Sequence, residues 1–157
     1  YKDIRVDPLI EQSFLTSNEL SGYVAVKSHY LMRKNSLIGF ENFLKNVVDF
    51  SGIGDFIYLP IKTYSLGMVG RLIFTILTSF DYECLALDEG FGTGDNSFKT
   101  KAEKRTNQFI KNAGTLIFAS HSNELLKKFC KRGLVFDKGQ IVFDGSLSKA
   151  FKFYEQI

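Results

Sequence analysis

Two short apolar runs, each ending in polar residues, most constrain the fold of this chain. Cys84–Leu87 leads into Asp88 and Glu89, and Thr115–Ala119 leads into Ser120 and His121. Apolar residues at helical spacing precede, separate and follow these runs. Continuous apolar strands that alternate with helices are typical of a parallel sheet buried between helices, so the sequence predicts an α/β fold with a parallel core.

Helical periodicity outlines the other elements. Leu37, Phe40, Leu44 and Val47 predict one helix, with Asn35 or Ser36 as its cap and the glycine-rich stretch 51–54 as its end. Further helices are predicted around 68–80, 98–110 and 122–129, and after Ser146. Residues 134–143 alternate around a polar turn, which indicates a β-hairpin. A weak alternation in the first seven residues could be a strand, and residues 9–34 give no clear pattern.

Composition excludes some functions. A net charge of +3, with lysines spread among acids, does not predict nucleic-acid binding. The basic residues Lys99, Lys101, Lys104 and Arg105 are interpreted as a solvated helix face. Cys84 and Cys130 form no Cys-x-x-Cys pair, so a reducing compartment is expected. The densest apolar stretch, 72–80, is far shorter than the roughly 18 residues that span a bilayer.

The adjacent acids Asp88 and Glu89 are the first candidate for chemistry. Two carboxylates after a buried strand are costly to bury without a partner. A phosphate-bound Mg²⁺ would supply one: one carboxylate orients the hydrated ion and the next polarises a water. A solvated acidic turn explains the pair equally well. His121, at the end of the second run, would lie on the same sheet edge, although a surface histidine is the simpler interpretation.

The segment Tyr64–Met68, here called the signature segment, is the third candidate. Ser65 stands where a helix is predicted to start, and Gly67 would allow close backbone approach. Free amides and a hydroxyl at a helix N-terminus suit a phosphate, although an ordinary helix cap would have the same residues.

Together these segments resemble the ABC ATPase family. The signature segment resembles that family's Leu-Ser-Gly-Gly-Gln, with Arg71 following. Asp88 comes 17 residues after Arg71, at the interval of the Walker B aspartate, and Glu89 matches the catalytic glutamate. Asp95, seven residues after Asp88, matches the D-loop aspartate, and His121, 33 residues after it, matches the switch histidine. The joint spacing is far more specific than any one motif.

A subfamily is also visible. The phrases Asn18–Gly22, Phe50–Phe56, Lys62–Met68 and Gly94–Phe98 resemble the ATP-binding subunits that export O-antigen, capsule and teichoic acid. The resemblance covers residue 9 to the C-terminus. It implies a helical subdomain at about 13–70, which meets a membrane permease, and the Walker B, D-loop and switch segments with the C-terminal hairpin at about 71–157.

The family's mechanism implies the remaining expectations. A homodimer would hold ATP between subunits, with Tyr64, Ser65, Gly67 and Asp95 binding nucleotide. Asp88 would hold Mg²⁺, Glu89 would be the general base, and His121 would sense the γ-phosphate. The subunit would lie peripherally on the cytoplasmic face of the plasma (inner) membrane and drive export of a polysaccharide or lipid-linked glycan.

Three departures from the family accompany the resemblance. No Gly-Lys pair occurs anywhere in the sequence, so the Walker A phosphate loop is absent. The chain is then either a fragment, as a start at Tyr1 favours, or a degenerate subunit. Leu66 stands where serine or glycine is usual and is expected to slow turnover. Glu11 and Gln12 are alternative candidates for the Q-loop residue.

Three rival functions remain open. Gly90, Gly92 and Gly94 follow a strand as in a dinucleotide-binding fingerprint, but the last glycine is misplaced and the two acids would repel a pyrophosphate. A non-catalytic ABC-like docking subunit is compatible with the missing Walker A loop. A soluble ABC ATPase without a transporter is disfavoured by the export-type phrases.

Overall fold

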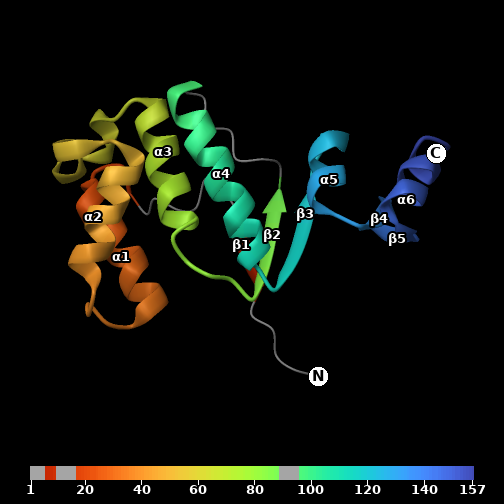
Figure 1. Cartoon of the computed structure of the whole chain (residues 1–157), viewed down its shortest axis with the longest axis horizontal. Coiled ribbons are helices and arrows are strands. Elements are labelled where there is room, and N and C mark those ends of the chain that lie inside the picture. The colour runs from red at the N-terminus through yellow and green to blue at the C-terminus, as the bar shows by residue number, and fades with distance from the viewer. Residues whose placement is uncertain (1–5, 10–16, 89–95) are drawn as a thin grey trace.

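The computed structural model describes residues 6–9, 17–88 and 96–157 of the chain. A parallel sheet in the order β1-β2-β3 lies at its centre. The helices α1, α2 and α3 gather on one side of it, and α4 runs between α3 and β2 in the view of Figure 1. The predicted parallel α/β fold is therefore confirmed.

The elements are β1 (Val6–Leu9), α1 (Gly22–Lys34), α2 (Phe40–Ser51), η2 (Gly54–Tyr58), η3 (Ile61–Thr63), α3 (Leu66–Leu77), β2 (Cys84–Asp88), α4 (Asn96–Asn112), β3 (Thr115–Ala119), α5 (Asn123–Phe129), β4 (Arg132–Asp137), β5 (Gln140–Ser146) and α6 (Leu147–Tyr154).

Helix α1 occupies part of the stretch whose pattern was unclear. Its buried side is formed by small and aromatic residues, Ala25, Val26 and Tyr30, while polar residues fill the turns between them. Ser21 caps the helix by accepting a hydrogen bond from the Val24 amide at 3.4 Å. The narrow apolar stripe explains why periodicity alone did not identify this helix.

The predicted cap of α2 is wrong. Gly39, with φ of 83°, precedes the helix and has no side chain to cap it. Asn35 instead ends α1 in a left-handed conformation with φ of 49°, and the Ser36 hydroxyl accepts a hydrogen bond from the Ile38 amide. Both residues therefore shape the turn between the helices. The predicted end of α2 is confirmed, because Gly52 terminates it at φ of 66°.

The main core joins the helices to β2. Leu85 is fully buried, as are Val26, Val47, Leu72 and Ile76 from the helices. Strand β3 is less buried than its apolar sequence predicted. Leu116 and Phe118 pack against the core, but Ile117 on the opposite face is 54% exposed, because among the described residues no element covers that face.

The hairpin β4–β5 and α6 form a smaller unit at the far end of the molecule from α1 and α2 (Figure 1). Helix α6 packs directly on β4, where a Cβ at Gly133 would lie 2.6 Å from Cβ of Ala150. The predicted hairpin and last helix are confirmed. Ser146 does precede α6, but its hydroxyl makes no capping hydrogen bond to it. No helix within the described ranges is long and apolar enough to cross a membrane.

Candidate active site

The carboxyl ends of the parallel strands bring the candidate residues to one edge. Asp88 is the last residue of β2 and lies opposite Ala119 of β3 in the strand register. His121 follows Ala119 by two residues and is exposed. Because ligands of open parallel sheets bind at this edge, Asp88 and His121 stand at the position where the chemistry was predicted. Glu89, Asp95, Glu11 and Gln12 lie outside the described residues.

Hydroxyl groups on both sides of His121 fix the turn that carries it. The Ser122 amide donates to Oγ of Ser120 at 3.1 Å, and the Leu125 amide donates to Oγ of Ser122 at 3.4 Å. The second bond caps α5, as the sequence predicted. The backbone of His121 is thus held between the end of β3 and the start of α5, which sets where its ring can reach.

The signature segment forms an exposed helix N-terminus. Ser65 caps α3, and its Oγ accepts a hydrogen bond from the Met68 amide at 3.2 Å. Ser65, Leu66 and Gly67 are all exposed. Amides in the first turn of a helix lack intrahelical acceptors and carry a partial positive charge. The predicted cap is confirmed, and the geometry suits an anionic group approaching from solvent.

Tyr64 supports this helix start from within the core. Its side chain is 9% exposed, and its hydroxyl donates to the Phe56 carbonyl at 2.5 Å. Burial raises the pKa of the Tyr64 phenol. A Cβ at Gly22 would lie 2.4 Å from the Tyr64 hydroxyl, so glycine is required there. The side chain of Tyr64 therefore anchors the signature segment to α1 and η2, and its part in nucleotide binding stays a prediction.

Leu66 and Gly67, at the exposed start of α3, differ in their contacts. A Cβ at Gly67 would meet Ser65 Oγ at 3.9 Å, an ordinary contact, so the close approach predicted for Gly67 does not occur within this chain's described residues. Leu66 is 92% exposed. Among the described residues, this large apolar side chain at a helix N-terminus has no packing role. Its expected effect on turnover stays a prediction.

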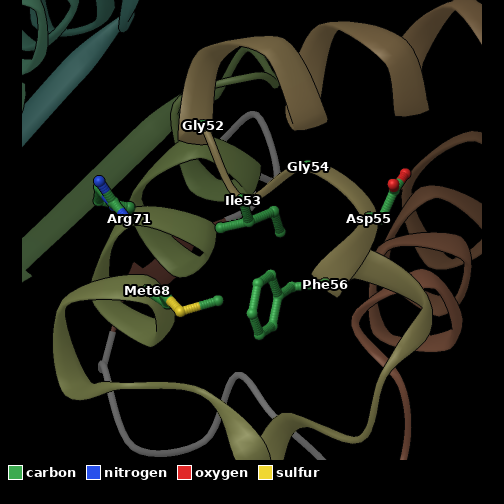
Figure 2. A pocket seen from close by; sticks show the side chains of 7 residues that line it. All are labelled: Gly52, Ile53, Gly54, Asp55, Phe56, Met68 and Arg71. Carbon is green, nitrogen blue, oxygen red and sulfur yellow. The ribbon is translucent and has the colours of Figure 1, made fainter.

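A shallow hollow of about 460 Å³ lies beside the signature helix rather than at the sheet edge. Met68 and Phe56 face each other across it, with Ile53 above them, while Arg71 and Asp55 stand at opposite sides (Figure 2). The loop Gly52–Phe56 and α3 thus enclose a mainly apolar space. Its lining does not include the residues predicted to carry hydrolysis.

Few described side chains at the carboxyl edge of the sheet could bind a metal ion. Within the described residues no group of three or more His, Cys, Asp and Glu could hold an ion. A transition-metal centre requires such a group of side chains. Mg²⁺ does not, because it is commonly held by one or two carboxylates together with water and phosphate oxygens. Asp88 at the end of β2 fits that simpler arrangement.

Comparisons with known proteins agree with the fold. The chain is 42% identical over 123 residues to the O-antigen export system ATP-binding protein RfbE of Yersinia enterocolitica, covering 78% of this chain and 52% of that protein. It is 31% identical over 148 residues to the teichoic acids export ATP-binding protein TagH of Bacillus anthracis, covering 94% of this chain and 27% of that protein. No protein-family model matches.

A solved structure described as the ATP-binding subunit of an ABC transporter superposes with a TM-score of 0.69. It covers 96% of this chain and 62% of that structure's chain, at 16% identity, which establishes similarity of fold. Fold and sequence together define the class: the chain is homologous to part of the ATP-binding subunits of ABC transporters. Within that class its relatives are ATP-binding proteins of O-antigen and teichoic acid export. The chain spans about half the length of RfbE and about a quarter of TagH.

Proposed function

We propose that the protein is the ATP-hydrolysing subunit of a transporter that exports a polysaccharide or a lipid-linked glycan. The observation that carries this proposal is the register of β2 and β3, which aligns Asp88 with Ala119, two residues before His121, at one sheet edge. The names of the relatives supply the substrate class.

In this proposal Glu89, His121 and Asp88 each have a separate role in ATP hydrolysis. Glu89 accepts the proton of the attacking water, and His121 hydrogen-bonds the terminal phosphate and that water. Asp88 would hold the hydrated Mg²⁺, which would neutralise charge on the phosphate oxygens. Each role needs the group at the carboxyl end of a parallel strand.

The signature segment acts on a second subunit. In a head-to-tail homodimer, Ser65 and Gly67 offer a hydroxyl and first-turn amides to ATP held by the partner, and Tyr64 and Asp95 complete that contact. The exposure of Ser65 and Gly67 supports this role, since both are available to another chain.

The proposed assembly places the subunit at a membrane. The helical part at about 13–70 would meet an integral-membrane permease, and the subunit would be peripheral on the cytoplasmic face of the plasma (inner) membrane. The remaining part, about 71–157, would carry the hydrolytic residues. Nucleic acid is not a partner in this proposal.

An alternative is a non-catalytic ABC-like docking subunit. The absence of a Gly-Lys pair in these 157 residues favours it, because that pair belongs to the loop that cradles the β- and γ-phosphates. The two proposals differ in whether Glu89 has a catalytic task.

The variant Glu89→Gln, made in the subunit expressed from its complete reading frame, distinguishes the catalytic proposal from the docking proposal. We expect phosphate release to fall at least about a hundredfold, because the amide cannot accept the proton. ATP binding and dimerisation should persist. The matched control is Asp137→Asn, which removes an exposed carboxylate of the hairpin turn. Turnover retained in Glu89→Gln would count decisively against this mechanism, and absence of turnover in the wild type would favour the docking subunit.

A further inference from the structure

Helix α4 meets the helical part of the molecule through an aromatic cluster with one ring from each helix. Phe98 of α4 is 1% exposed, and its ring centroid lies 5.5 Å from that of Phe50 in α2 and 5.6 Å from that of Phe74 in α3. Both contacts are edge-to-face, a favourable geometry for aromatic pairs. This cluster fixes the first turns of α4 against α2 and α3.

Arg105, two turns further along α4, makes a second contact of a different kind. Its Nη2 donates to Oγ of Ser79 at 2.7 Å, and its guanidinium carbon lies 4.2 Å from the ring centroid of Phe50. Ser79 in turn donates to the Thr75 carbonyl in the last turn of α3 at 2.6 Å. One side chain therefore joins α4 to the C-terminal ends of both α2 and α3.

This contact corrects the interpretation of Arg105 as part of a solvated face. Its side chain is half-buried, and burial lowers the pKa of its guanidinium from the ordinary value. Arginine nevertheless stays charged in proteins, so the group is a cation held against a ring and a hydroxyl. Lys99 and Lys104 on the same helix are exposed, as predicted.

Around Arg105 the packing between α4 and the helical part is open. A hollow of about 750 Å³ lies beside this contact, and its lining includes Asp49 of α2, Asp81 and Gln108. Close-packed interfaces move as one body, whereas elements joined by a few long side chains across a hollow can shift relative to one another. Arg105 and the aromatic cluster thus join α4 to α2 and α3 beside this hollow, while Phe109 and Ile110 of α4 pack against the main core.

We infer that Arg105 is a positioning residue that links the signature helix α3 to α4 and so couples the two ATP sites of the dimer. The inference rests on the proposed function, in which Ser65 at the start of α3 contacts ATP on the partner. Helix α4 lies downstream of Asp88 and Glu89, which in the proposed function serve the subunit's own ATP. A shift on either side of Arg105 would reach the other, because both helices are rigid rods: α3, with 12 residues, is roughly 18 Å long, and α4, with 17 residues, is roughly 25 Å long.

The test compares three variants of the subunit expressed from its complete reading frame. Arg105→Met keeps the length of the stem but removes the cation and its hydrogen bond. Arg105→Lys keeps the cation. Lys99→Met removes an exposed cation from the same helix and is the matched control. The measurements are phosphate release across a range of ATP concentrations, thermal unfolding, and amide hydrogen exchange over residues 66–77.

We expect Arg105→Met to remain folded while its hydrolysis falls about three- to tenfold, the range of a typical coupling effect. Its dependence on ATP concentration should become that of independent sites, and exchange at the start of α3 should become faster. Arg105→Lys should recover part of the hydrolysis and part of the protection from exchange. Lys99→Met should match the wild type. Wild-type hydrolysis and cooperativity in folded Arg105→Met would overturn the inference. So would a loss of activity that only matches a loss of folded protein.

Failure of the proposed function would give a different pattern. In that case the wild type would release no more phosphate than Glu89→Gln. The link between the helices is then judged on hydrogen exchange alone. Faster exchange over residues 66–77 in Arg105→Met, but not in Lys99→Met, would support it, and unchanged exchange would overturn it.

Discussion

The signature segment shows how single residues divide between folding and function. The Ser65 hydroxyl caps α3, so its loss would weaken the helix by about 1 kcal/mol whatever it binds. Tyr64 holds the segment to Phe56. Gly67 differs from both, because no contact among the described residues requires a glycine at that position.

Gly67→Ala should therefore separate stability from activity. Alanine is favoured over glycine inside a helix by roughly 0.5 to 1 kcal/mol, so the melting temperature should rise slightly. ATP hydrolysis by the dimer should fall, since the new methyl group stands at the exposed helix N-terminus where phosphate is proposed to bind. Calorimetry and phosphate release measure the two effects.

Gly70→Ala is the matched control for Gly67→Ala. Gly70 lies one turn further along α3, and a Cβ there would meet nothing within 4 Å. The stabilisation should be similar and the hydrolysis unchanged. Equal activity in both variants would contradict a phosphate contact at Gly67.

At the scale of elements, the β4–β5 hairpin is tied together by charge as well as by its ladder. Arg132 donates from Nε to Oδ1 of Asp144 at 2.7 Å, and a second bond runs from Nη2 to Oδ2. The hydrogen bonds from Arg132 lower the pKa of the Asp144 carboxyl. Because both side chains are exposed, their contribution to stability is expected to be small and sensitive to salt.

The pH dependence of the hairpin's stability should reveal the ion pair between Arg132 and Asp144. A depressed carboxyl pKa gives stabilisation that is complete above the unfolded value of about 3.9 and is lost as pH falls through the lower folded value. Arg132→Met should return the pKa of Asp144 to the ordinary range, as measured by NMR titration of its carboxyl carbon. Lys149→Met on α6 should leave that titration unchanged. An identical Asp144 titration in wild type and Arg132→Met would show that the ion pair does not persist in solution.

At the scale of the whole molecule, the nucleotide site is assembled from separate pieces. In Figure 1 the start of α3 lies at the upper side of the view, and β2 points toward that side from the other side of α4. The described part offers an amide-rich helix start and a strand edge with acidic and imidazole groups. A phosphate cradle of the Gly-Lys type is not encoded in the 157 residues.

The 157-residue chain alone should therefore bind ATP weakly. The strand edge bears the carboxylate of Asp88, which repels phosphates unless a cation intervenes, and the signature segment is proposed to serve a partner. Titration calorimetry of Mg-ATP into the chain should give little heat. The subunit expressed from its complete reading frame is the comparison. A dissociation constant near or below about 1 μM for the isolated chain would contradict this expectation.

The sequence alone determined the parallel α/β plan, the cap at Ser65, the turn around His121 and the hairpin. These depend on local periodicity, on side chains that bond neighbouring amides, and on the rule that parallel strands end at one edge. Glu89 and Asp95 lie outside the described residues, so their placement still rests on sequence spacing.

Only the tertiary structure decided which residues are buried and what they contact. It placed Gly39 rather than Asn35 or Ser36 before α2, left one face of β3 open, anchored Tyr64 in the core and brought Arg105 onto Phe50 and Ser79. The physical reason is clearest for Tyr64 and Arg105. Each contacts a segment far away in the sequence, Gly22 for Tyr64 and Phe50 for Arg105, and local patterns carry no record of such contacts.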